Sequence, residues 1–114
     1  MPDRLGDNAR LQHILDAILE IENYTNGVDV DTFISNSMMF SATLHQLEII
    51  GEASSRLSKQ LVQDNSHIPW ARMIGLRNLV IHEYFGIDEM TIWSIVKNNI
   101  PDLKEKIALI ISHL

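Results

Sequence analysis

The chain of 114 residues contains no cysteine. This absence excludes disulfides, a thiolate nucleophile and zinc sites built on sulfur ligands, and it suits a reducing compartment. Long hydrophobic runs are also missing, because the longest apolar run covers residues 107–111 and a membrane-spanning helix needs roughly 20 residues. The N-terminal segment MPDRLGDNAR is polar and lacks the apolar stretch of a secretory signal. We therefore expect a cytoplasmic protein with no membrane segment, in which residues 1–114 form a single domain.

Basic residues are scarce relative to acidic ones. Nine Lys and Arg stand against fifteen Asp and Glu, which gives a formal net charge of −6. Such a balance argues against binding to nucleic acid by overall charge alone. The charge is uneven, since residues 1–55 hold nine acids and two bases, whereas residues 56–114 hold six acids and seven bases. Any anion site is therefore expected in the second half of the chain.

Motifs for metal and nucleotide binding are largely absent. The sequence has no Walker loop, no G-x-G-x-x-G, no G-x-S-x-G and no His-Glu-x-x-His. His45, Glu48 and Glu52 recur at helical spacing, and one helix face of this kind can in principle hold a hard metal ion. Polar residues at this spacing are more often the solvated side of an amphipathic helix. We therefore predict no metal site and no cofactor.

The hydrophobic period is helical throughout, and no segment sustains the alternation of a strand. This predicts an all-α fold of four to five helices. Expected helices run from about Asp3 to Asn23, from Thr32 to Lys59, from Pro69 to near Tyr84, and from Asp88 to the C-terminus.

Several residues predict where these helices begin, end or meet. The segment around Gly27 reads as a connection, and Asp31 and Asp88 as N-caps. Gly51 interrupts the second helix and is predicted to let another helix approach closely. Pro101 is expected to kink or restart the last helix.

Chemically versatile side chains gather in one place, at the end of the third predicted helix. Arg77 and Asn78 are followed, after three apolar residues, by His82, Glu83 and Tyr84. Arginine offers a planar fork of donors for a phosphate, and histidine can transfer a proton near neutral pH. Together these groups suit metal-free cleavage of a phosphodiester, with Asn78 orienting either group. The alternative is structural, because such residues near a helix end often serve only to cap and pack.

Helix geometry bears on how these groups can meet. At about 100° per residue, Arg77 and Tyr84 share a face, whereas His82 lies roughly 140° away from Arg77. Within one regular helix Arg77 and His82 therefore diverge. A second subunit can supply the missing member, which suggests a site formed in a dimer.

The segment resembles the R-x4-H-x-Y motif of the HepT-like toxins, a branch of the HEPN superfamily. Arg77, His82 and Tyr84 match that motif without a gap, and Asn78 matches the polar residue that usually follows the arginine. Similar surroundings extend over nearly the whole chain, at residues 50–53, 68–70, 74–78, 84–88 and 100–103. One departure is Glu83, where the family often has a small residue; a carboxylate there would repel RNA and could raise the pKa of His82.

The resemblance implies an antiparallel HEPN bundle that forms a homodimer, with the two motifs facing each other across a cleft. It further implies a metal-independent endoribonuclease that cleaves RNA and acts as the toxin of a type VII-like toxin–antitoxin system. Arg77 and His82 would be catalytic, with Arg72 as a further cation in the cleft, and Asn78 supporting. The implied partner is an MntA-like nucleotidyltransferase antitoxin, which would neutralise the toxin by AMPylation of Tyr84.

Two other functions remain open from the sequence. The chain can be a non-catalytic, nucleotide- or substrate-binding helical subunit of a nucleotidyltransferase complex, in which Arg77 and His82 grip a phosphate. It can also be a helical dimerisation domain whose motif residues only stabilise the fold.

Overall fold

The computed structural model describes residues 4–82 and 88–114. Every regular element in these ranges is helical, which confirms the all-α prediction. The elements are α1 (Arg4–Thr25), α2 (Val30–Ser35), α3 (Ser37–Ser55), α4 (Lys59–Asp64), α5 (Trp70–His82), α6 (Glu89–Ser94), the π-helical turn η1 (Ile95–Asn99) and α7 (Ile100–Ser112). None of the described helices is long and apolar enough to cross a membrane.

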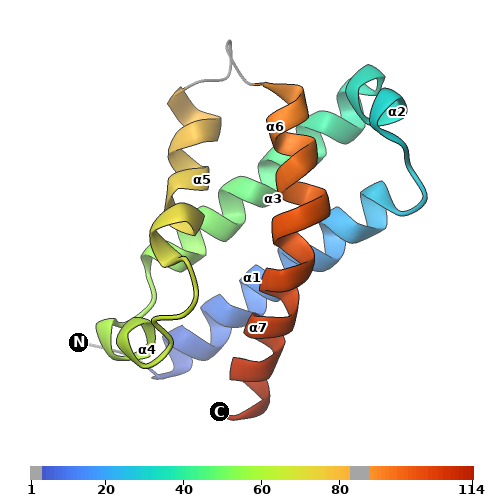
Figure 1. Ribbon diagram of the computed structural model, residues 1–114. Coiled ribbons are helices and arrows are strands. Elements are labelled where there is room, and N and C mark those ends of the chain that lie inside the picture. The colour runs from blue at the N-terminus through green and yellow to red at the C-terminus, as the bar shows by residue number, and fades with distance from the viewer. Residues whose placement is uncertain (1–3, 83–87) are drawn as a thin grey trace.

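The long helices form an antiparallel bundle with α3 in contact with two of the others. Helices α1, α3, α5 and the column of α6, η1 and α7 run alternately up and down, and α1 begins at the end of the bundle where α7 finishes (Figure 1). Helix α3 packs against α1 on one side and α5 on the other, while α1 also packs against α7. The short α2 bridges α3 and α6.

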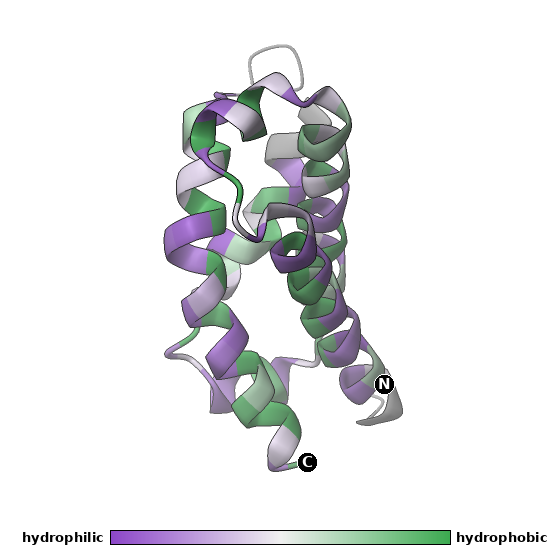
Figure 2. Cartoon of the chain, turned by 90° about the vertical axis from the view of Figure 1, so that its right-hand side faces the viewer, coloured by the Kyte–Doolittle hydropathy of each residue, from purple (hydrophilic) through white to green (hydrophobic). Residues whose placement is uncertain are grey.

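One hydrophobic core joins these helices. The helices in view carry both hydrophobic and hydrophilic residues, as expected of amphipathic helices (Figure 2). The fully buried large side chains come from α1, α2, α3, α6, α7 and the segment before α5, and include Leu11, Ile14, Ile18, Ile21, Phe33, Leu47, Ile50, Ile68, Ile92, Ile100 and Ile107. The described part of α5 adds Trp70 and Met73. The helix that carries the motif is therefore fixed to the core at its N-terminal half.

The prediction of one continuous helix from Thr32 to Lys59 is wrong, because this segment is interrupted at two places. At the first break, the side-chain oxygen of Asn36 accepts a 3.0 Å hydrogen bond from the Met39 N–H and starts α3. At the second, Ser58 accepts a 3.2 Å bond from the Leu61 N–H and starts α4. Short polar side chains stabilise helix starts by satisfying N–H groups that have no partner within the helix. The apolar spacing continues across both breaks and therefore concealed them.

The predicted caps were partly right. Asp88 caps α6 and accepts a 3.0 Å bond from the Met90 N–H, as expected. At the first connection the cap is Asp29, which accepts a 2.8 Å bond from Thr32, while Asp31 lies inside the first turn of α2. The prediction of Asp31 was therefore wrong by two residues. Gly27 lies in the preceding turn with a φ of 71°, a conformation that glycine adopts without steric cost.

Pro101 restarts the last helix without breaking the column. It lies in the first turn of α7, where its missing N–H does not disrupt the hydrogen-bonding pattern. The preceding turn widens to the π form, in which the Ile100 N–H bonds to the carbonyl oxygen of Ile95. This wider turn leaves room for a proline ring that would otherwise press on the carbonyl four residues earlier.

Candidate functional site

The backbones of α3 and α5 approach each other closely at Gly51, as the sequence predicted. A Cβ atom at Gly51 would lie 2.6 Å from the backbone nitrogen of Arg77 and 2.8 Å from its Cβ. It would also lie 3.0 Å from the carbonyl oxygen of Met73. No side chain fits at these distances, so glycine sets the separation of the two helices at the residue that opens the motif.

Two residues of α3 bind the guanidinium group of Arg77 through one nitrogen. Nη1 donates a 2.9 Å hydrogen bond to Oε2 of Glu52 and a 3.2 Å bond to Oγ of Ser55. The Ser55 hydroxyl donates its own hydrogen to the carbonyl oxygen of Glu52, at 2.7 Å. Since that hydrogen is committed, the Ser55 oxygen is oriented to accept from Arg77. Both hydrogens of Nη1 thus have partners.

Glu52 is shared between two arginines. Its Oε1 accepts a 2.8 Å bond from Nε of Arg56, while its Oε2 accepts the bond from Arg77. Hydrogen bonds from Arg77 and then from Arg56 lower the pKa of Glu52 below its ordinary value. The carboxylate therefore remains ionised and keeps both arginines in place at neutral pH.

The other edge of the Arg77 guanidinium is not engaged within the described ranges. Neither Nε nor Nη2 makes a hydrogen bond to the residues whose side chains the structure describes, 6–78 and 88–114. The side chain is 32% exposed, so solvent and ligands can reach it. A guanidinium edge of this kind presents parallel donors that match two oxygens of a phosphate.

The structure describes less of the other motif residues than of Arg77. Asn78 follows Arg77 on α5 and is exposed, and His82 is the last residue of that helix. Tyr84, the predicted site of AMPylation, lies outside the described residues, as does Glu83. The roles of Asn78, His82 and Tyr84 therefore stay predictions.

Comparison with known proteins reveals a family for this chain. A family model described as "Ribonuclease HepT-like" matches residues 14–110. The chain belongs to the HepT-like ribonuclease family. It is 38% identical over 102 residues to "Putative RNase MJ1380" of Methanocaldococcus jannaschii, covering 90% of this chain and 94% of that protein. It is also 38% identical over 96 residues to "Probable ribonuclease HepT" of Thermococcus cleftensis, covering 84% and 87% respectively. No solved structure matches the chain.

Membership of the HepT-like family confirms the resemblance and supports a ribonuclease activity. His45, Glu48 and Glu52 line the same groove beside α3, the helix face for which the sequence favoured a solvated side over a metal site. No three His, Asp or Glu side chains in the described part of the chain gather as a metal site. Glu52 instead binds Arg77 and Arg56.

Sequence reasoning missed Glu52 and Ser55 as partners of Arg77 in this HepT-like chain. The available signal was Gly51, since a glycine that admits a second helix also brings its neighbours close to that helix. Glu52 follows Gly51 directly, and Ser55 lies one turn after it. The register between α3 and α5 was needed to pair them with Arg77.

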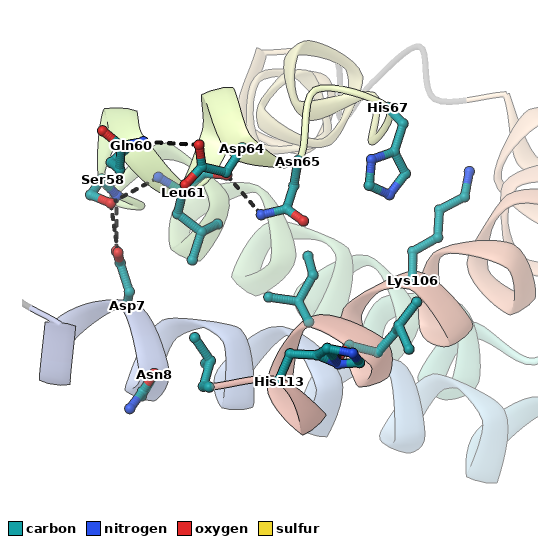
Figure 3. A pocket seen from close by; sticks show the side chains of 13 residues that line it. Asp7, Asn8, Ser58, Gln60, Leu61, Asp64, Asn65, His67, Lys106 and His113 are labelled. Carbon is teal, nitrogen blue, oxygen red and sulfur yellow. Dashed lines mark hydrogen bonds between the residues drawn. The ribbon is translucent and has the colours of Figure 1, made fainter.

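Two grooves in the described ranges flank other parts of the HepT-like bundle. The larger, of about 1040 Å³, lies between the start of α1, α4 and the end of α7, and none of the predicted site residues lines it (Figure 3). Its charged groups are used within the fold, since Asp7 accepts bonds from Ser58 and Asp64 accepts one from Gln60. Lys106 pairs with Asp102. A smaller groove of about 430 Å³ runs between α1 and α3 and reaches Glu52 and Arg56.

Proposed function

We propose that this HepT-like chain is a metal-independent endoribonuclease toxin that cleaves RNA with Arg77 and His82. One observation carries the proposal. Arg77 is held by α3 through Nη1 alone, with its second edge unengaged among the described residues, and it lies five residues before His82 on one helix. In a chain of the HepT-like ribonuclease family, such an arginine is suited to bind the scissile phosphate.

The proposed reaction is an internal transesterification. The ribose 2′-oxygen attacks phosphorus and loses its proton, and the bond to the 5′-oxygen breaks as that oxygen gains a proton. The products are a 2′,3′-cyclic phosphate and a 5′-hydroxyl. Arg77 would stabilise the extra negative charge on the phosphorane, and the imidazole of His82 would transfer the protons.

We further propose that the active form is a homodimer. Helix geometry separates Arg77 and His82 by roughly 140° around one regular helix, so a single copy directs them apart. A two-fold axis beside α5 would face the motif of one copy toward the motif of the other. Two copies of His82 would then supply both a base and an acid to one phosphodiester.

Regulation is proposed to act on Tyr84, with Asn78 supporting the catalytic pair. A nucleotidyltransferase antitoxin would transfer AMP to the phenol of Tyr84, two residues after His82. The modification would add negative charge and adenine bulk beside the proposed catalytic groups. Both effects would exclude RNA from the cleft, the first by repulsion and the second by occupying space.

The test compares wild-type protein with His82→Ala on mixed RNA in excess EDTA. The intact mass of each sample is measured first, because an AMP adduct would suppress activity. We expect only the wild-type protein to produce fragments ending in 2′,3′-cyclic phosphate. Equal cleavage by both proteins would refute the role of His82.

Absence of cleavage by unmodified wild-type protein would favour the non-catalytic alternative. In that case Arg77→Ala should weaken binding of a nucleotide or of the nucleotidyltransferase partner, measured by titration. If the substitution altered only the thermal stability of the chain, the motif would serve packing alone.

A further inference from the structure

We infer that Glu52 and Ser55 are positioning residues for Arg77, which orient its guanidinium so that the Nε–Nη2 edge meets the scissile phosphate. The inference rests on the proposed ribonuclease function and extends it to α3. It follows from how the hydrogen bonds are divided among the three nitrogens of one guanidinium group.

Nη1 carries two hydrogens, and both are used inside the chain. One goes to Glu52 and the other to Ser55, at 2.9 and 3.2 Å. Two acceptors on one nitrogen fix the rotation of the guanidinium plane, which a single bond would leave free. Among the side chains that the structure describes, none accepts a hydrogen from Nε or Nη2. The Nε hydrogen and one Nη2 hydrogen form the edge that can bind two phosphate oxygens in parallel.

The side chains of Glu52 and Ser55, which accept these bonds, are held in place by further hydrogen bonds. Arg56 binds the second oxygen of Glu52 at 2.8 Å, and the Ser55 hydroxyl is oriented by its 2.7 Å bond to the Glu52 carbonyl oxygen. Gly51 keeps the backbone of α3 against Arg77. The arginine is therefore oriented before RNA binds. The conformational entropy of its long side chain is lost when the protein folds, and not again when RNA binds.

Full engagement of the guanidinium by Glu52 would have been inhibitory. A carboxylate on the Nε–Nη2 edge would compete with phosphate for the same donors. Glu52 instead binds Nη1, which lies outside that edge, and its charge is also shared with Arg56. The arrangement orients Arg77 without occupying the edge that would bind the substrate.

The experiment measures RNA cleavage by Glu52→Gln and Ser55→Ala on an end-labelled pool of random-sequence RNA. We expect kcat to fall about 10- to 100-fold for Glu52→Gln, because a misplaced catalytic group loses rate on this scale. Ser55→Ala should lose less, and KM should change less than kcat in both. Glu48→Gln is the matched control, since it lies one turn earlier on α3 and makes no ion pair within the described ranges.

Chemical rescue separates positioning from a structural role. Millimolar guanidinium should restore part of the cleavage lost in Arg77→Ala, because Glu52 and Ser55 still offer their acceptors. It should restore far less in the double variant Arg77→Ala/Glu52→Gln, and as much in Arg77→Ala/Glu48→Gln as in Arg77→Ala. Circular dichroism melting checks that each variant is folded.

The possible outcomes distinguish the two claims. If Glu52→Gln cleaves as fast as Glu48→Gln, or if guanidinium rescues equally without Glu52, the positioning role is overturned while the ribonuclease function stands. If Arg77→Ala itself cleaves like the wild-type protein, the proposed function fails, and the role of Glu52 fails with it.

Discussion

Gly51→Ala tests whether the close approach of α3 and α5 sets the position of Arg77. The added Cβ would lie 2.6 Å from the Arg77 nitrogen, and ordinary contact begins at 3.4 Å. The atoms that it meets are backbone atoms and a Cβ, which cannot rotate out of the way. Helix α5 must therefore move away from α3 by about 0.8 Å near Arg77, the difference between those distances.

The expected cost in stability is moderate, whereas the expected cost in activity is large. Forcing an extra methyl group into a filled space typically costs about 1–3 kcal/mol. Alanine is the better helix former by about 1 kcal/mol, so the net loss in free energy of unfolding should be at most about 2 kcal/mol. A shift approaching 1 Å at a catalytic group can reduce the rate about 10²-fold. We therefore expect Gly51→Ala to fold and to cleave RNA poorly.

Gly75→Ala on α5 is the matched control. A Cβ at Gly75 meets no described atom within 4 Å, so the same chemical change should raise stability by about 0.5–1 kcal/mol and leave cleavage near the wild-type rate. Urea denaturation and RNA cleavage are measured for both variants. The reasoning is refuted if Gly51→Ala matches Gly75→Ala in both stability and activity.

Two further predictions concern stability. Ser58→Ala removes the N-cap of α4 and a 2.6 Å hydrogen bond to the buried Asp7. Urea denaturation should show that the free energy of unfolding falls by about 1–3 kcal/mol. Ser58→Thr keeps the hydroxyl and should largely avoid this loss. Glu52 has a lowered folded-state pKa, so its contribution is present above its ordinary value of 4.5 and lost as pH falls through the folded-state value. The stability difference between wild type and Glu52→Gln should therefore shrink below pH 4.5, and a constant difference in acid melts would contradict this.

The long helices could be predicted because their apolar spacing repeats over several turns. Helix α1 was expected at residues 3–23 and observed at Arg4–Thr25. The same method failed at Asn36, because the apolar residues on either side of it keep helical spacing while its side chain caps a new helix. A capping residue inside a continuous pattern changes the chain direction without changing the pattern. Such breaks depend on tertiary packing, as where Phe33 of α2 contacts Trp93 of α6 with ring centroids 5.0 Å apart.

The candidate site was predictable only in part. Motif spacing made Arg77 a candidate, and a glycine within a helical pattern correctly predicted the close approach of α3 and α5 at Gly51. Neither could pair Arg77 with Glu52, since the rotation of a residue on its own helix says nothing about the register of the helix beside it. Glu52 was instead grouped with His45 and Glu48 on its own helix, where it does share a face. Its partner across the helix interface decides its role.

The paired arginines also bear on how an acidic chain would bind a phosphate at the proposed site. The net charge of −6 repels RNA at long range, and solvent and salt screen that repulsion at distances beyond about 10 Å. At short range the cluster of Arg77, Glu52 and Arg56 has two positive charges and one negative charge, so it keeps a net charge of +1. Its attraction for a single phosphate is therefore modest, and binding through it must depend on directed hydrogen bonds. Directed bonds require a fixed donor plane, which is what two acceptors on one nitrogen of Arg77 provide.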